Sequence, residues 1–351
     1  MTTIIHSDPS RDLQVLLDDT LPPDLLELLD KTIWGQHGVS FRSLDMAKML
    51  QDLSNPSFMR LTKSGQTVAA AVRNRKQVEI AGTPYDAVHL ALFTVHRDFT
   101  RQGLGSVLAQ VSRTLYFDLL QAPGVLYGYI ESGNEASLRL NLGLGYQDMG
   151  EIRSRIFSRS RPRLSDRVEV LGQNARSDML ARLKAAYHSH ALCSFDTSLD
   201  PDRYLVLRRQ GHIVAGAQVH VLHWQLLALP GWQGKIAMQV LPHIPLLGRE
   251  FKPADLRFAR VGNLFAEPGS EALISEILET ALAAQHLPFA AVLADPRGAV
   301  ESRILSAVDF GALDHVVSGA FHLIGEFRGV DQHQLKQLSK APVVISPKDP
   351  L

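Results

Sequence analysis

The residues best suited to chemistry lie in one glycine-containing turn between two apolar segments. An apolar, strand-like run ends at Val95, the turn carries Gly103 and Gly105, and a helical apolar pattern begins at Ser106. Glycines let backbone N–H groups approach a ligand without a Cβ in between. The first turn of a helix adds unpaired donors and the positive end of its dipole. The sequence therefore predicts a phosphate-binding turn, against the simpler interpretation of an ordinary tight turn.

A histidine in the preceding apolar run is a candidate general base. Alternation along a strand places His89 on the same face as Ala91, Phe93 and Val95. An imidazole titrates near neutral pH, which suits proton transfer from an amine. A partly buried structural histidine explains the same pattern equally well.

The elements that position these residues form a mixed α/β pattern. Short strands are expected over 13–17, 58–61, 67–72, 87–95 and 125–130. Helices are expected over 22–34, 44–50, 106–120 and 135–144. Further strand up to residue 157 closes the unit.

From residue 168 the same order of elements begins again, which predicts a duplicated fold. The arginine-rich, proline-containing segment 153–167 marks the boundary, and we interpret it as a solvated linker or strand edge rather than a phosphate clamp. We therefore divide the chain into domains 1–160 and 161–330. The proline-containing end, 331–351, is expected to be loosely ordered.

Two motifs of the first domain resemble those of the GCN5-related N-acetyltransferases (the GNAT superfamily). The family's glycine motif is Arg/Gln-x-x-Gly-x-Gly/Ala, and this chain has Thr100-Arg101-Gln102-Gly103-Leu104-Gly105, which departs at the first position. The family's second motif, Asn-x-x-Ala followed by Leu-Tyr-x-x-x-Gly-Phe, is similar to Asn134-Glu135-Ala136-Ser137 and the run from Leu140 to Gly145-Tyr146. The resemblance covers about residues 10–158.

The resemblance implies an α/β fold of two tandem GNAT-like domains, each a mostly antiparallel, twisted sheet flanked by helices. The second domain is degenerate, because Glu267-Pro268-Gly269-Ser270-Glu271 replaces the glycine motif and its two acids would repel a pyrophosphate. His220, His223, Trp224 and Trp232 of this domain either shape an acceptor pocket or simply pack.

For the first domain, the resemblance implies binding of acetyl-CoA or another acyl-CoA. The pantetheine arm would pair with the strand edge at Phe93, Thr94 and Val95, and Asn134 and Ser137 would line the far side of the cofactor. The pyrophosphate would lie against the backbone amides of six consecutive residues, which are Arg101, Gln102, Gly103, Leu104, Gly105 and Ser106.

The family's activity implies direct transfer of the acyl group to an amine in a ternary complex. His89 lies six residues before Val95, where histone-acetylating members carry a catalytic glutamate. Seven residues after the motif asparagine, where the family often has a tyrosine, this chain has Asn141, which donates a hydrogen bond but cannot donate a proton at neutral pH. Tyr146 and Tyr129 are the candidate substitute acids, against the simpler interpretation that both are core or strand aromatics. A non-catalytic acyl-CoA-binding or regulatory protein, and an acyltransferase whose two domains enclose an unusual acceptor, remain the alternatives.

Composition excludes several other classes of function. Lys+Arg and Asp+Glu number 36 each, which argues against broad binding to nucleic acid or to an anionic membrane. A single cysteine, Cys193, excludes a disulfide framework, and no metal site is expected. With neither a secretion signal nor an apolar run of membrane-spanning length, we expect a cytoplasmic protein. Its partner would be a small-molecule amine or another acyl acceptor, and a homodimer stays open.

Overall fold

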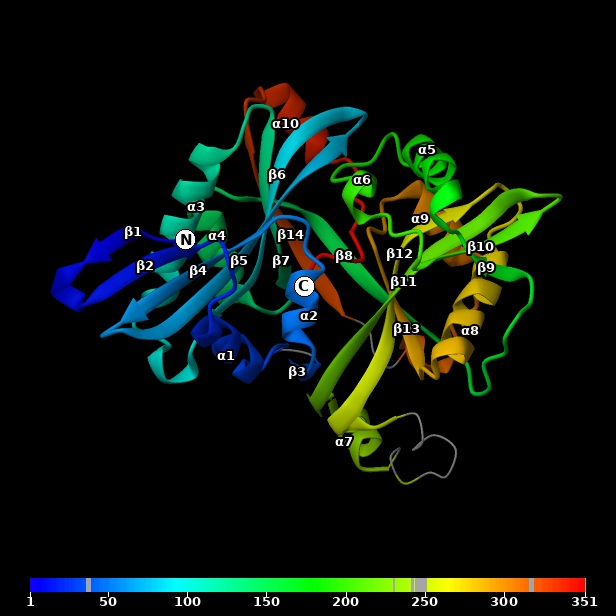
Figure 1. Cartoon of the computed structure of the whole chain (residues 1–351), viewed down its shortest axis with the longest axis horizontal. Coiled ribbons are helices and arrows are strands. Elements are labelled where there is room, and N and C mark those ends of the chain that lie inside the picture. The colour runs from blue at the N-terminus through cyan, green and yellow to red at the C-terminus, as the bar shows by residue number, and fades with distance from the viewer. Residues whose placement is uncertain (36–38, 230, 241–242, 244–250, 316–318, 351) are drawn as a thin grey trace.

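The computed structural model describes residues 1–35, 39–229, 231–240, 243, 251–315 and 319–350 (Figure 1). The first half contains the following elements: β1 (Thr2–Asp8), β2 (Leu13–Asp18), α1 (Pro23–Lys31), β3 (Ser40–Ser43), α2 (Met46–Gln51), β4 (Pro56–Lys63), β5 (Gln66–Ile80), β6 (Thr83–Val95), α3 (Leu104–Leu119), β7 (Gly124–Glu131), α4 (Glu135–Gly143) and β8 (Gln147–Ser158).

The second half contains a similar series: β9 (Val168–Val170), α5 (Arg176–Ala186), α6 (Phe195–Ser198), β10 (Tyr204–Arg209), β11 (His212–Ala228), α7 (Gly231–Val240), β12 (Leu256–Ala266), α8 (Leu273–Gln285), β13 (Phe289–Ala294), α9 (Ala299–Ser306), β14 (Ala320–Arg328) and α10 (Gln332–Leu338). Among the described residues, no helix is both long and apolar enough to cross a membrane.

The strands of the described chain form one 14-stranded sheet in the order β1-β2-β4-β5-β6-β7-β14-β8-β13-β12-β11-β10-β9, and β3 pairs with β11. The pairings β6–β7 and β12–β13 are parallel, and the other pairings between named strands are antiparallel. Helices flank this sheet, so the predicted mixed α/β class is confirmed (Figure 1).

The two halves repeat one arrangement and exchange a strand. The hairpin β4–β5, strands β6 and β7 and helix α3 correspond in order to β10–β11, β12, β13 and α8. Yet β14, from the end of the chain, lies between β7 and β8, and β8 continues the sheet into β13 (Figure 1). Strands therefore cross the predicted division at residue 160, and that division itself stays a prediction.

The core of each half lies between its sheet and one long amphipathic helix. Helix α3 buries Leu104, Leu108 and Tyr116, whose spacing of four and eight residues places them on one side of the helix. Helix α8 buries Ile274, Ile277, Leu278 and Leu282 in the same way. Each large apolar side chain contributes about 1.5–3 kcal/mol when it is buried. This packing holds α3, and hence the glycine turn before it, against the sheet.

The end of the chain differs from the loose ordering expected from its prolines. Asp331 caps α10 with a capping box, and Val343, Val344 and Ile345 are buried. Val343 also forms a parallel bridge with Ala191. The apolar run 343–345 therefore packs between the two halves. Burial of its side chains stabilises a segment whose flanking prolines cannot donate backbone hydrogen bonds.

Several arginines of the boundary segment are paired with carboxylates. Arg153 contacts Glu151 at 2.6 Å, and Arg167 contacts Glu276 at 3.4 Å. Arg155 forms a 2.7 Å ion pair with Asp314. These pairs agree with the interpretation as a strand edge and linker.

Candidate functional site

Strands β6 and β7 part at the middle of β6. Their parallel pairing runs from Asp86↔Gly124 to Leu90↔Gly128 and ends there in the described chain. Just beyond, Leu92 has a φ of +51°, and the register between β5 and β6 shifts. A bulge of this kind bends a strand away from its neighbour. The edge expected to meet the pantetheine arm, residues 93–95, lies at this opening.

The predicted glycine turn follows β6 after a short 3-10 helix, Arg97–Phe99, and α3 begins at Leu104, so that Gly105, expected in the turn, lies in the first turn of the helix. Gly103 is the N-cap of α3 with a φ of +74°, and a Cβ added there would meet nothing within 4 Å. A Cβ on Gly105 would lie 3.4 Å from Cγ2 of Val95. The first N–H groups of α3, from Leu104 onward, have no partner inside the helix. The turn therefore presents backbone N–H donors, with no Cβ at Gly103, near the opening between β6 and β7. Such donors suit a phosphate group.

Two cations that the sequence analysis missed hold this turn. Arg11 donates to the main-chain oxygen of Gln102 at 2.9 Å, and Lys63 donates to its Oε1, also at 2.9 Å. They lie 91 and 39 residues before Gln102 in the chain. No local pattern links them to the turn, and only the pairing of β2 with β4 brings them to it.

The polar residues of the second motif make local contacts within α4. The Oδ1 of Asn134 accepts from the N–H of Ser137 at 3.2 Å and so caps the helix. Asn141 donates from Nδ2 to the main-chain oxygen of Ser137 at 2.8 Å. Both asparagines thus stabilise α4, and their assigned roles in cofactor binding and catalysis stay predictions.

Tyr146 lies in the core of the first half and is 4% exposed. Burial raises the pKa of its phenol far above the usual value, and the nearby carboxylate of Glu326 adds to the shift. The main-chain N–H of Tyr146 donates to the main-chain oxygen of Asn141 at 3.2 Å, but in the described chain no side-chain hydrogen bond or ring contact joins either residue to His89. The three catalytic candidates are therefore not brought together in one constellation.

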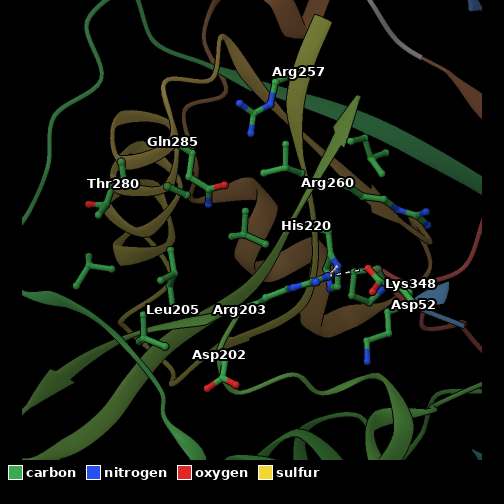
Figure 2. A pocket seen from close by; sticks show the side chains of 18 of the residues that line it. Asp52, Asp202, Arg203, Leu205, His220, Arg257, Arg260, Thr280, Gln285 and Lys348 are labelled. Atoms are coloured by element: carbon green, nitrogen blue, oxygen red, sulfur yellow. Dashed lines mark hydrogen bonds and ion pairs between the residues drawn. The ribbon is translucent and has the colours of Figure 1, made fainter. Parts of the chain in front are cut away.

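The second half contains a cavity of about 760 Å³. It lies between α8 and strands β10 to β12, and α2, segment 164–170 and residues 347–348 complete its lining (Figure 2). Figure 2 shows Asp52, Arg203 and His220 meeting at one end, where NH1 of Arg203 is 2.9 Å from Oδ2 of Asp52 and 2.9 Å from Nδ1 of His220. Burial, with Arg203 and Arg260 nearby, lowers the pKa of His220 to about 3.

The other aromatic candidates of the second half do not line this cavity. His223 contacts Asp255 at 2.5 Å, and Trp224 stacks on Phe41 with ring centroids 3.6 Å apart. Trp232 is 70% exposed. Within the described residues, no group of three or more His, Cys, Asp and Glu side chains is arranged to hold a metal ion.

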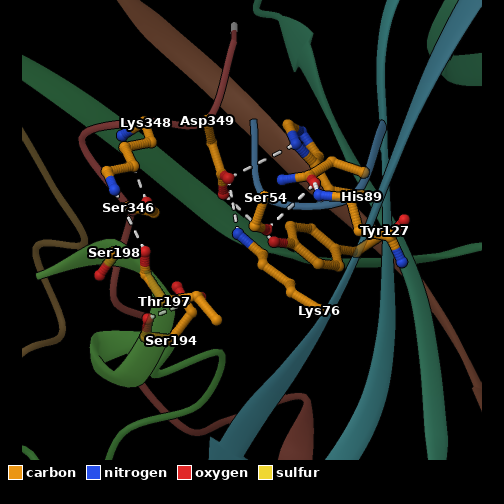
Figure 3. A network of polar contacts seen from close by, with 12 residues as sticks. Ser54, Lys76, His89, Tyr127, Ser194, Thr197, Ser198, Ser346, Lys348 and Asp349 are labelled. Atoms are coloured by element: carbon orange, nitrogen blue, oxygen red, sulfur yellow. Dashed lines mark hydrogen bonds and ion pairs between the residues drawn. The ribbon is translucent and has the colours of Figure 1, made fainter. Parts of the chain in front are cut away.

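His89 lies at the centre of a buried network between the two halves (Figure 3). Its ring stacks on Tyr127 with centroids 5.0 Å apart and meets Tyr129 edge-on at 5.2 Å. Its Nδ1 lies 3.7 Å from Oδ1 of Asp349. Burial lowers its pKa to about 4, although Asp349 opposes the shift. The ring is therefore neutral at pH 7 and accepts a proton only weakly.

Asp349 links the halves of the molecule. Its carboxylate accepts from Lys76 of β5 at 2.6 Å and from the hydroxyl of Tyr127 at 3.1 Å. Arg260 of β12 donates to the main-chain oxygens of Asp349 and Ser346. Burial would raise the pKa of Asp349, but Lys76, His89 and Arg260 outweigh it and keep the pKa below the usual value. The sequence analysis missed this contact, since Lys76 and Asp349 are 273 residues apart.

Comparison with known proteins adds the fold family. No protein-family model matches the sequence, and no curated protein matches it. The structure is similar to N-myristoyltransferase from Saccharomyces cerevisiae solved with bound myristoyl-CoA, with a TM-score of 0.57 at 12% identity over 95% of this chain and 89% of that one.

It is also similar to a GCN5-related N-acetyltransferase from Kribbella flavida, with a TM-score of 0.50 at 13% identity over 92% of this chain and 73% of that one. A GCN5-related glucosamine N-acetyltransferase region of a fungal multi-domain β-N-acetylglucosaminidase gives a TM-score of 0.57 at 11% identity, over 89% of this chain and 38% of that one. At such identities the likeness shows the fold alone. The chain has the fold of these GCN5-related N-acetyltransferases, which confirms the predicted fold.

Proposed function

We propose that this chain is an acyl-CoA-dependent N-acyltransferase, with acetyl-CoA as the first acyl donor to test. The observation that carries the proposal is the opening between β6 and β7 beyond Leu90, after which the chain passes through a short 3-10 helix, Arg97–Phe99, to the glycine turn. The N-myristoyltransferase that shares this fold was solved with an acyl-CoA, myristoyl-CoA. A cytoplasmic location also stays part of the proposal, in keeping with the lone, buried thiol of Cys193.

The residues present fit an acyl-CoA. Residues 93–95 offer a strand edge to the pantetheine amides, and the backbone of 101–106 offers N–H donors to the pyrophosphate. Arg11 and Lys63 add positive charge beside Gln102. When bound, the coenzyme supplies an activated thioester. The chain must hold that thioester and allow the acceptor ammonium to lose a proton.

His89 stays our candidate base, in its neutral form. Direct transfer needs no enzyme nucleophile, and Cys193 is unsuited to act as one because burial raises the pKa of its thiol. Because Asn141 and Tyr146 make structural contacts, we assign the protonation of the leaving thiolate to solvent.

A non-catalytic acyl-CoA-binding protein is the second candidate function. It is favoured by the placement of Asn141 against its own helix and of Tyr146 in the core. Release of free thiol from acetyl-CoA and myristoyl-CoA, measured with and without a panel of amines, separates the two functions. Amine-dependent release supports the enzyme, and tight binding without release supports the second candidate.

We expect Gly103→Ala to weaken binding of coenzyme A at least tenfold. The new Cβ projects from the turn where the pyrophosphate would approach, and the positive φ is unfavourable for alanine by about 1 kcal/mol. Calorimetric titration with coenzyme A measures the change.

Gly269→Ala is the matched control. Gly269 has a φ of +84°, and a Cβ added there would also meet nothing within 4 Å, but it lies in the second half, where acids replace the glycine motif. Equal stability loss in both variants with weakened binding in Gly103→Ala alone supports the site. Unchanged affinity in Gly103→Ala would place the ligand elsewhere, and absence of binding to the unaltered chain would refute the proposed function.

A further inference from the structure

The cavity of the second half has a size and lining suited to a small organic molecule. Its volume of about 760 Å³ lies within the usual range of ligand pockets, about 300–1,000 Å³. Val219 and Val221 of β11 and Ala281 and Ala284 of α8 supply an apolar surface on two sides. The hydroxyl of Thr280, a lining residue that is 7% exposed, has no hydrogen-bond partner in the described chain. A bound molecule could provide one.

The lining contains cations that can pair with an anionic group. Of its carboxylates, Asp52 and Glu169 form ion pairs with Arg203 and Arg208, Asp45 and Asp202 accept from the neutral side chains of Ser43 and Gln173, and Asp166 has no cation within ion-pair distance in the described chain. In the described part of the chain, no carboxylate lies within ion-pair distance of Lys48 or Arg257. Figure 2 shows the guanidinium of Arg257 apart from the group formed by Asp52, Arg203 and His220. A carboxylate or phosphate is the natural counterpart of such a guanidinium.

The other end of the cavity adjoins the buried network of the first half. Asp52 and Lys348 line both this cavity and a second, much smaller one of about 10 Å³, which also touches Lys76 and Asp349. Figure 3 shows Lys348 and Asp349 side by side in the chain, with Asp349 directed toward His89. The large cavity therefore extends from Arg257 toward the candidate base of the first half.

We propose that this cavity binds the acyl acceptor, an amine that also carries a carboxylate or phosphate group on an apolar body. The inference rests on the proposed function. The anionic group pairs with Arg257, the body packs between β11 and α8, and the amine faces the Asp52–Lys348 end. The amine nitrogen bonds to the acyl carbon as the carbon–sulfur bond breaks. Of the two protons that the ammonium loses, neutral His89 takes one and passes it to solvent, and the other reaches the leaving thiolate through solvent.

The experiment uses matched amines with and without the anionic group. The pairs are L-leucine and 3-methylbutylamine, 6-aminohexanoate and hexylamine, and glucosamine 6-phosphate and glucosamine. Binding is measured by calorimetry and turnover by release of thiol from acetyl-CoA. We expect the anionic member of at least one pair to bind ten or more times more tightly, and the carboxylate and phosphate pairs distinguish the two anions.

Arg257→Met tests the assigned cation, because Arg257 is exposed and its replacement leaves the core intact. We expect a tenfold or greater rise in KM for the anionic amine with an unchanged Kd for coenzyme A. Arg209→Met, at an exposed arginine of β10 outside the cavity, is the control and should match the unaltered chain.

The outcomes separate this inference from the proposed function. If thiol release occurs equally with neutral and anionic amines, or if Arg257→Met leaves KM unchanged, the acceptor assignment is wrong while the acyltransferase stands. If anionic amines bind and Arg257→Met abolishes this binding, but coenzyme A does not bind, the cavity holds an anionic amine and its role as acyl acceptor is refuted. If no anionic amine binds better than its neutral counterpart, the cavity assignment itself is refuted.

Discussion

Replacement of Asp349 by asparagine is expected to lower the free energy of unfolding by about 3–5 kcal/mol. The substitution keeps the size of the side chain and removes its charge. Lys76, whose side chain is 3% exposed, then lies buried without a counter-ion, and the nearby Arg260 guanidinium loses an attractive charge as well. Breaking a buried pair by removing one partner is costly because water cannot solvate the charge that remains.

Equilibrium unfolding in urea measures this loss. Asp19→Asn is the control. The side chain of Asp19 is 71% exposed, and its one ion pair in the described chain is with the amino group of Met1 at 3.5 Å. We expect the free energy of unfolding of this variant to change by no more than about 0.5 kcal/mol. The double variant Lys76→Met/Asp349→Asn should be more stable than Asp349→Asn alone, because it removes the unpaired ammonium. An Asp349→Asn variant as stable as the unaltered chain would mean that the network does not join the halves in solution.

Stability is also expected to fall by about 4 kcal/mol between pH 8 and pH 5. Burial lowers the pKa of His89 to about 4 and that of His220 to about 3, whereas an unfolded histidine titrates near 6.5. Below pH 6.5 the unfolded chain therefore binds protons that the folded chain does not, and unfolding becomes easier as the pH falls. Each histidine accounts for about 2 kcal/mol of the loss at pH 5.

The same unfolding measurement, repeated from pH 8 to pH 5, tests this dependence. His89→Gln and His220→Gln should each remove about half of the slope, and the double variant should remove most of it. His212→Gln, at an exposed position of β11, should keep the full slope. Asp349, with its lowered pKa, contributes stability that is lost only below about pH 4, outside this window. A double variant with an undiminished slope would contradict the explanation.

The sequence determined the features that depend only on residues close together in the chain. A run of apolar residues, two glycines and a helical period lie within fifteen positions, 92–106, and the turn forms where this pattern predicts it. The spacing of the second motif was enough to indicate the GNAT fold, which the structure confirms. Backbone conformation at a glycine and the start of an amphipathic helix are local properties, and for this reason they can be predicted from a short stretch.

Tertiary structure alone decided the surroundings of each side chain. The apolar pattern correctly placed His89 on a strand, but the bulge at Leu92 puts Val95 in one cluster with Val88 and Leu90 and not on the face of His89. Only the approach of Asp349, Tyr127 and Tyr129 makes the ring of His89 wholly buried and weakly basic. Arg11 and Lys63 beside the turn, and the exchange of β14 into the first half, likewise depend on contacts between distant segments. The glycine turn is thus a property of its own sequence, whereas burial, charge pairing and pKa arise only when remote parts of the chain pack together and exclude water.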